Sequence, residues 1–225
     1  MSISEKLITI AENEPKIYDK GKQDEYDAFW DTFQDYGERK FYSQGFAGYG
    51  WTKDNLKPKY PIVTDRVTNR TNGMFAFAEK LTEIMIPLYF YDTTSSETFY
   101  YCTKLVKIGD DTGGGLWVTK GRTFNSNFGG CSKLEEIRFL DYNEKGEYVP
   151  SEIGNSINFK NCPLSTASIV NIIEHLVNSS TVTLTLKTSA KENMSFPYTS
   201  PQSNTTYNSW DELVATKPDC TISLA

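Results

Sequence analysis

A spaced apolar pattern recurs four times along this chain and constrains its fold more than any other feature. Each copy starts with Phe, and a small residue, Leu and Ile then follow at intervals of three. The phenylalanines stand at positions 75, 99, 128 and 159, so the copies begin 24, 29 and 31 residues apart. Repetition at such a period is typical of a solenoid, whose copies bury their apolar sides against one another. The copies are Phe75, Ala78, Leu81 and Ile84; Phe99, Cys102, Leu105 and Ile108; Phe128, Cys131, Leu134 and Ile137; and a distorted fourth, Phe159, Cys162 and Leu164.

Residues 73–164 form the predicted repeat region. Within each copy the three-residue apolar spacing predicts a short helical turn with one side facing inward. The Ile at its end enters a short strand, as alternation and β-branching in residues 84–88 indicate. Polar turns of unequal length follow, at 92–96, 109–115 and 141–146. Insertions in solenoids collect on one face, so we expect function in these turns rather than in the regular positions.

The segments on either side of the repeats are expected to cap the solenoid, whose end copies would otherwise expose an apolar face. Residues 37–72 mix Gly, Pro and aromatic residues, which indicates an irregular connection and an N-terminal cap. Residues 165–225 are predicted to be a C-terminal helix–strand cap. Its predicted elements are a helix capped by Ser165 or Thr166, a strand at 182–186, a helix at 210–216 and a strand at 221–224.

Residues 1–36 are predicted to form an N-terminal helical arm. Ser2 and Glu5 make a capping box, and Pro15 divides the arm into two helices or kinks it. An aromatic stripe at helical spacing follows within residues 26–33. Two interpretations stay open: the stripe packs on the end of the solenoid, or the arm projects and pairs with copies of itself.

Charge and composition narrow the classes of partner. The formal net charge is −6, whereas nucleic-acid binding needs concentrated Lys and Arg, so we expect no nucleic-acid partner. No run of 18 apolar residues occurs, so no membrane insertion is expected. The first residues lack the basic and apolar segments of a secretory signal. The chain has 14 Tyr and 13 Phe, which supply either core or binding surface.

The cysteines follow the repeat. Three of the four occupy the same position, at residues 102, 131 and 162, and a spacing of about 30 residues is not a metal-ligand spacing. Stacked copies would bring Cys102 and Cys131 near each other, within possible disulfide reach. Because no secretory signal is found, we favour free thiols that act as small buried hydrophobes.

Residue types that would support catalysis are sparse, so a non-enzymatic protein without metal or cofactor is predicted. The single histidine, His175, lies on a predicted helix, where a structural or exposed role is favoured over that of a general base. One His and evenly spread Cys do not predict a zinc site. Glycines 113–115 lack the end of a phosphate loop and are read as a turn into a strand. The polar turns lack a Ca²⁺ loop pattern. Paired carboxylates of a glycoside hydrolase stay open, because their separation is a property of the fold.

The repeat resembles that of BspA-type leucine-rich-repeat proteins, whose pattern is close to A-F-x-x-C-x-x-L-x-x-I-x-I-P. The first copy ends with the same residues, Ile84-Met85-Ile86-Pro87. The stretch from Ile10 to Trp30 is similar to leaders of such proteins from gut Firmicutes and their prophages, and Ala215 to Ala225 is similar to their terminus. The resemblance implies a short leucine-rich-repeat solenoid of the α/β repeat class, with a helical arm and a helix–strand cap.

The same resemblance implies a binding or structural role. Few copies, no signal or wall anchor and a distorted fourth copy fit a phage or prophage component, assembled in the host cytoplasm and carried on the tail or head of the virion. The partner would be a protein or a surface glycan, and the arm would attach to the virion or self-associate. A bacterial surface adhesion protein is the alternative, and a glycan hydrolase is the third. Trp117, Tyr142 and Tyr148 lie in or beside the variable turns and are the candidate binding residues.

Overall fold

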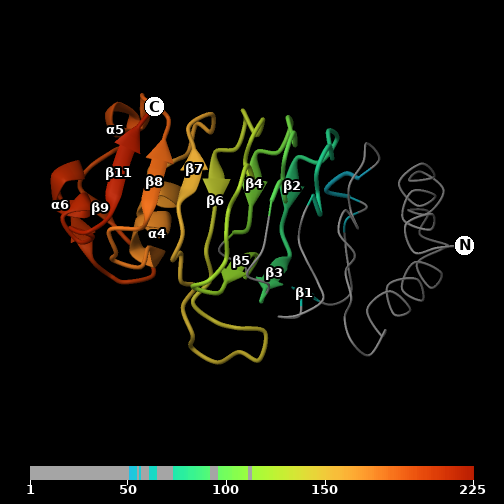
Figure 1. Ribbon diagram of the computed structural model, residues 1–225, viewed down its shortest axis with the longest axis horizontal. Helices are drawn as coiled ribbons and strands as arrows, with labels where there is room; N and C mark the ends of the chain where they lie inside the picture. Colours follow the sequence, from blue (N-terminus) through green and yellow to red (C-terminus); the bar gives the residue numbers. More distant parts are fainter. Residues whose placement is uncertain (1–50, 55, 57–60, 65–72, 92–95, 111–112) are drawn as a thin grey trace, which may run out of the picture.

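The computed structural model describes residues 51–54, 56, 61–64, 73–91, 96–110 and 113–225. The predicted helical arm, residues 1–36, and most of the connection at 37–72 lie outside these residues. The described part is mostly β, with a β-solenoid of about four turns and few helices (Figure 1). The predicted repeat solenoid is therefore confirmed in its general form.

Two parallel sheets run along the solenoid. The Ile that recurs in the first three copies sets the register of one of them, since Ile84 pairs with Ile108 and Ile108 with Ile137. The second sheet pairs the strands that follow, with Leu88 opposite Leu116. The first sheet consists of β2 (Glu83–Ile84), β4 (Lys107–Ile108) and β6 (Glu136–Ile137), and the second of β1 (Ile62–Thr64), β3 (Pro87–Phe90) and β5 (Gly115–Val118).

The segment from Phe to Leu in each copy is a series of three-residue turns. In the first copy the amide of Ala78 donates to the carbonyl of Phe75 (3.1 Å) and that of Leu81 to the carbonyl of Ala78 (3.0 Å). The next two copies repeat both bonds. The predicted three-residue period is thus present, although none of these turns is a helix. Adjacent copies are joined directly, because Phe77 N donates to Tyr100 O at 2.8 Å.

The interior is a stack of identical side chains. The ring centroids of Phe75 and Phe99 lie 5.4 Å apart, those of Phe99 and Phe128 5.4 Å apart, and those of Phe128 and Phe159 4.4 Å apart. These distances are within the range of favourable aromatic pairs. The four rings are almost completely buried, so the distorted fourth copy still continues the stack.

The cysteine row lies beside the ring stack and is made of free thiols, as predicted. The Sγ of Cys102 donates to the carbonyl of Phe75 and that of Cys131 to the carbonyl of Phe99, both at 3.0 Å. Burial raises the pKa of the Cys131 thiol to about 12 and raises that of Cys102 further. Cys102 and Cys131 therefore fill space in the core, and each also donates to a carbonyl of the preceding copy.

The C-terminal cap contains the predicted helices and strands. Ser165 is the N-cap of its main helix and accepts a hydrogen bond from Ser168 N at 3.3 Å. The final predicted strand and the short helix before it are also present. The cap comprises strands β8 (Thr183–Leu186) and β11 (Thr221–Leu224), which form a parallel sheet with β7 (Ile157–Phe159) of the fourth copy; the helices α4 (Thr166–His175), α5 (Ala190–Asn193) and α6 (Trp210–Val214); and the hairpin β9 (Tyr198–Thr199) with β10 (Thr206–Tyr207).

Helix α4 lies beside strand β6, and its side chains form the backbone hydrogen bonds that a further strand would otherwise form. Ile137 N donates to Ser168 Oγ (2.9 Å). Phe139 N donates to Asn171 Oδ1 (2.6 Å), and Asn171 Nδ2 donates back to Phe139 O (3.2 Å). Ser168 and Asn171 are three residues apart and so share a helix face. The helix thereby covers backbone groups that an open sheet edge would leave unpaired.

Candidate functional site

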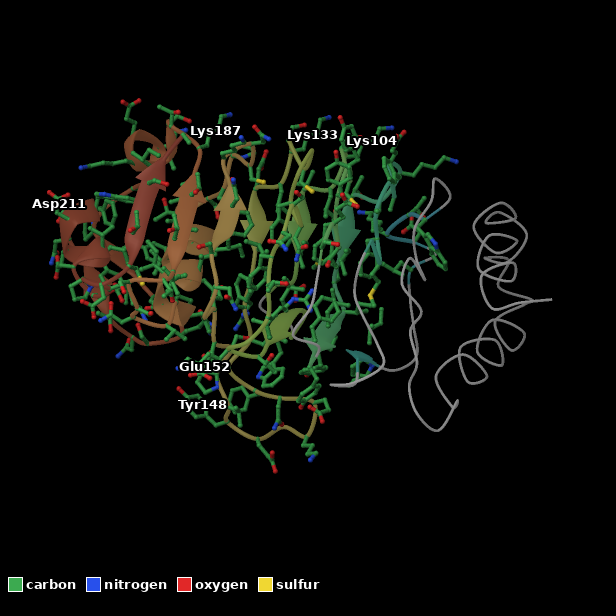
Figure 2. The ribbon with its side chains drawn as sticks, viewed as in Figure 1. Lys104, Lys133, Tyr148, Glu152, Lys187 and Asp211 are labelled. Atoms are coloured by element: carbon green, nitrogen blue, oxygen red, sulfur yellow. The ribbon has the colours of Figure 1, made fainter. Side chains whose placement is uncertain are left out.

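The three predicted binding residues meet at one turn, residues 141–149, which projects from the solenoid as the yellow loop in Figure 1. Tyr142 and Tyr148 pair as an antiparallel bridge across the turn, and their rings touch edge to face at a centroid distance of 5.4 Å. Tyr142 is 55% exposed and Tyr148 70% exposed. Figure 2 shows Tyr148 at this projecting end of the molecule. We call residues 141–149 the tyrosine turn.

Trp117 supports the tyrosine turn from below and offers little surface to a partner. It lies in strand β5 and is only 5% exposed. Its indole Nε1 donates to Val149 O at 2.6 Å, and its ring contacts Tyr91 at a centroid distance of 4.7 Å. The predicted turn into a strand at 113–115 is present, but the strand carries Trp117 inward. Its role is to hold the turn, since burial removes it from direct contact.

The tyrosine turn is ordered by one asparagine. Asn143 Oδ1 accepts from the backbone amides of Lys145 and Glu147, each at 3.0 Å. Asn143 Nδ2 donates to the Glu147 carboxylate at 2.7 Å. Side-chain bonds of this kind are a standard way for Asn to fix a turn. Gly146 supplies the positive φ (+74°) that closes it. The two exposed tyrosines are therefore presented on a held backbone.

The base of the turn is bonded to the solenoid on both sides. The Ser151 hydroxyl donates to Leu140 O at 2.8 Å, and the Ser151 amide also donates to Leu140 O, at 2.9 Å. Tyr91 OH donates to the Glu144 carboxylate. Burial and the nearby Glu144 carboxylate raise the pKa of the Tyr89 hydroxyl. The Ser151 hydroxyl also lies 3.2 Å from Leu116 O in β5, and Tyr91 directly follows β3. The turn is therefore tied to this sheet and has less conformational freedom to lose on binding.

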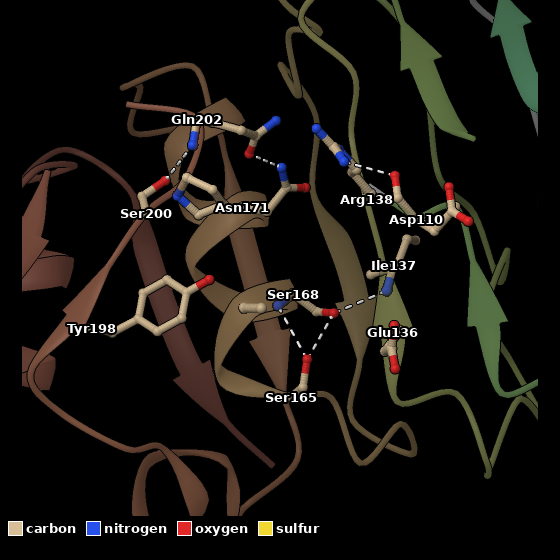
Figure 3. A pocket seen from close by; sticks show the side chains of 13 residues that line it. Asp110, Glu136, Ile137, Arg138, Ser165, Ser168, Asn171, Tyr198, Ser200 and Gln202 are labelled. Atoms are coloured by element: carbon tan, nitrogen blue, oxygen red, sulfur yellow. Dashed lines mark hydrogen bonds between the residues drawn. The ribbon is translucent and has the colours of Figure 1, made fainter. Parts of the chain in front are cut away.

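A separate pocket of about 260 Å³ lies between the strands of the second and third copies and the cap (Figure 3). On the repeat side Arg138 Nη1 donates to the main-chain oxygen of Asp110 at 2.7 Å. On the cap side Asn171 Nδ2 donates to Gln202 Oε1, and Gln202 N donates to Ser200 Oγ at 3.3 Å. The lining residues are Gly109, Asp110, Glu136, Ile137, Arg138, Ser165, Ala167, Ser168, Asn171, Tyr198, Ser200, Pro201 and Gln202.

His175 is buried beside this pocket and has a partner that the sequence did not reveal. Its Nε2 lies 3.3 Å from Asp141 Oδ1 and its Nδ1 lies 2.7 Å from Asn171 O. Gln202 Nε2 donates to the second Asp141 oxygen at 2.9 Å. The hydrogen bond from His175 is the main cause that lowers the pKa of Asp141. The structure thus places His175 in a structural role, one of the two roles predicted for it.

The geometry of His175 does not support acyl-transfer catalysis. A catalytic histidine needs one ring nitrogen for the orienting carboxylate and the other for the nucleophile or substrate. Here Asp141 takes one nitrogen and a main-chain carbonyl, that of Asn171, takes the other. One of the cap hydroxyls that line the pocket, Ser200 Oγ, donates to Glu174 Oε2 at 2.8 Å and not to His175. The histidine and the hydroxyl that a catalytic pair would need are therefore both engaged in hydrogen bonds that stabilise the cap.

Glu174 and Lys217 show the same structural use of charged groups. Glu174 accepts from Ser203 Oγ at 2.5 Å and from Tyr207 OH at 3.1 Å. Burial and this carboxylate raise the pKa of Tyr207 to about 12. Lys217 Nζ donates to Glu174 O at 2.9 Å and Leu176 O at 2.5 Å, at the C-terminal end of α4. A cation there satisfies carbonyls that the helix leaves unpaired, and burial lowers the pKa of Lys217.

The pocket was not predicted from the sequence. Its cap residues come from a helix and from a loop 31 residues further on, and spacing gives no sign of that contact. One available signal was the polar pair Ser168 and Asn171, which lies within the otherwise apolar stripe of α4. Among the described residues no group of three or more His, Cys, Asp or Glu could hold a metal ion.

Comparison with family models, with curated proteins and with solved structures finds no match for this chain. No helix within the described ranges combines the length and the apolar character that a membrane crossing requires.

Proposed function

We propose that this protein is a non-enzymatic binding or structural protein, a BspA-type leucine-rich-repeat solenoid that engages a protein or a surface glycan through the tyrosine turn. One observation carries the proposal: the projecting tyrosine turn presents two exposed tyrosines on a backbone fixed by Asn143, Ser151 and Trp117. Tyrosine gives a large contact area at a small cost in side-chain entropy. A held turn also loses little freedom on association.

The non-enzymatic assignment is supported by how the polar groups are used. His175, Asp141, Glu174 and Ser200 bond to one another or to backbone groups inside the cap. A general base needs to reach the proton it removes, and these groups are engaged in the fold instead. Turnover of a cell-wall or capsule polysaccharide, abolished by Asp141→Asn or Glu174→Gln, would overturn this assignment.

The proposed setting is the virion of a phage or prophage, on the tail or head, in contact with the host surface. The support for this setting is the likeness of the repeat, of the stretch from Ile10 to Trp30 and of the stretch from Ala215 to Ala225 to such proteins. The N-terminal segment 1–36 would attach the protein to the particle or join copies of it. A bacterial surface protein of the same repeat type is the alternative, and immunogold labelling of purified particles against labelling of the cell envelope distinguishes the two.

The binding role of the tyrosine turn can be tested with two matched double variants. In Tyr142→Ala with Tyr148→Ala the rings are lost, whereas in Tyr142→Phe with Tyr148→Phe they are kept. Exposed substitutions of this kind change stability by about 0.5 kcal/mol or less, so both proteins should fold. We expect the alanine protein to lose binding to host cells and the phenylalanine protein to keep most of it. Equal binding by all three proteins would show that the partner is held elsewhere.

A further inference from the structure

A second surface, on the outside of the three-residue turns, combines lysines and aromatic rings. Five residues after the Phe of each of the first three copies stands a lysine: Lys80, Lys104 and Lys133. All three are exposed. Burial in the core accounts for Phe, Cys and Leu at the regular inner positions. The lysines are outside the core, so packing of the solenoid does not require lysine there.

The row of lysines continues into the cap. Strand β7 pairs with β8 so that Phe159 lies opposite Leu186. An exposed lysine directly follows the end of each strand, Lys160 after β7 and Lys187 after β8. Figure 2 shows Lys104, Lys133 and Lys187 along one edge of the molecule. We call Lys80, Lys104, Lys133, Lys160 and Lys187 the lysine edge.

Within the part of the chain that the structure describes, the lysine edge has no ion-paired carboxylate. No ion pair joins any of its five lysines to a described residue, although Lys53, Lys107 and Lys191 do form such pairs. Adjacent parallel segments lie about 4.8 Å apart, so the row brings its positive charges close together in a chain whose net charge is −6. Like charges repel at this spacing, and an external anion would relieve that repulsion.

Exposed aromatic rings accompany the lysines on the same turns. Phe77 and Tyr101 stand two residues after the Phe of their copies and are 40% and 45% exposed. Their rings stack at a centroid distance of 5.7 Å, and Tyr100 lies edge-on to both. The buried residues of each copy are three residues apart. The exposed ring and the lysine of a copy, Phe77 and Lys80 or Tyr101 and Lys104, are also three residues apart and fall between the buried positions.

The backbone at these rings is held in a conformation that aromatic residues rarely adopt. Phe77 has φ +59° and Tyr101 φ +57°, whereas the equivalent residue of the third copy is Gly130, with φ +81°. The left-handed region costs a non-glycine residue roughly 1–2 kcal/mol. A glycine would fit this position without strain, as Gly130 does, so the rings are kept at a cost to the fold. Strain of this kind often marks a functional surface.

We propose that the lysine edge and the rings of Phe77 and Tyr101 bind an acidic polysaccharide that lies along the axis of the solenoid. A row of single charges matches a linear polymer that carries one anionic group per sugar, and exposed rings suit the apolar faces of sugar units. Nucleic acid fits less well, because the row has no arginine, whose planar guanidinium suits phosphate better than the lysine ammonium does. This surface is separate from the tyrosine turn and does not depend on its role.

The test measures the affinity of the full chain for polygalacturonate, with neutral dextran, a single-stranded oligonucleotide and anionic lipid vesicles as comparisons. We expect binding to polygalacturonate alone, and it should weaken as salt rises. Lys80→Gln with Lys104→Gln and Lys133→Gln should weaken it about tenfold or more. The control triple Lys53→Gln, Lys120→Gln and Lys191→Gln changes the net charge equally, lies outside both the lysine edge and the tyrosine turn, and should bind almost as the unchanged protein does.

A second variant separates the rings from the fold. Phe77→Gly with Tyr101→Gly places in the first two copies the residue that the third copy already has, so folding should be retained while affinity for polygalacturonate falls several-fold. Tyr142→Ala with Tyr148→Ala should leave this affinity unchanged, whatever the tyrosine turn binds. The proposal fails if the two lysine triples behave alike, if the glycine variant binds normally, or if the oligonucleotide or the vesicles bind as tightly as the polysaccharide.

Discussion

The ring stack inside the solenoid and the tyrosine turn on its outside use aromatic residues in opposite ways. The stack repeats one residue, Phe, at one position in four successive copies, and its rings are almost completely buried. The turn occurs once, and its tyrosines are more than half exposed. The difference teaches that in this chain the most regular residues serve packing. Recognition is expected where the copies differ.

The largest effect should come from a gap in the stack. Phe99 contacts the rings of both neighbouring copies, so Phe99→Ala removes two ring contacts and leaves a cavity. Such changes cost about 3–5 kcal/mol, and urea denaturation of the purified protein measures the loss. Tyr148→Ala is the matched change in the turn and should cost about 0.5 kcal/mol or less. Similar losses for the two variants would remove the distinction between the regions.

A smaller effect is expected where the repeats meet the cap. Asn171→Ala leaves the buried amide of Phe139 without the side-chain oxygen that it now reaches at 2.6 Å. An unsatisfied buried donor costs about 1–3 kcal/mol. Asn171→Asp keeps an acceptor at that position and serves as the control for the amide of Phe139. If Asn171→Ala left the free energy of unfolding unchanged in denaturation experiments, the hydrogen bonds between α4 side chains and the backbone beside β6 would not contribute to stability.

The smallest effect depends on pH and lies where the turn joins the cap. The pKa of Asp141 is lowered in the folded protein, chiefly by the hydrogen bond from His175. A lowered carboxyl pKa contributes stability above the unfolded value of about 3.9, and that contribution is lost as the pH falls through the folded pKa. Asp141→Asn should therefore destabilise the protein at pH 6, and the difference from the unchanged chain should shrink below about pH 4. A difference that stays constant across this range would mean that the charge of Asp141 adds nothing.

The sequence predicted the buried part of the fold well, because core packing requires apolar residues at regular intervals and these intervals are visible in the sequence. The Phe, Cys, Leu and Ile positions, the free thiols and the strand after Gly113–Gly115 are all present in the structure. Trp117 was predicted to bind because it lies in or beside a variable turn, but its burial in β5 shows that exposure cannot be inferred from nearness to a turn. A four-residue strand can be buried on both sides when another loop covers it.

The outer half of the structure was less predictable, for two physical reasons. Contacts such as Asp141 with His175, or Asn171 with Gln202, join segments more than 30 residues apart and leave no local pattern. The positive φ of Phe77 and Tyr101 runs against the preference of aromatic residues. The one sequence signal of a positive φ at this position was the glycine of the third copy, Gly130.

Native-state hydrogen exchange tests the central contrast between stack and turn most directly. The amides of Phe99 and Tyr101 donate to carbonyls of the next copy at 3.0 and 2.7 Å, so they should exchange only when the whole solenoid unfolds. The amide of Lys145 is held only within the tyrosine turn and should exchange far faster, through local opening. Equal protection of the two regions, or faster exchange at Phe99 than at Lys145, would contradict this account.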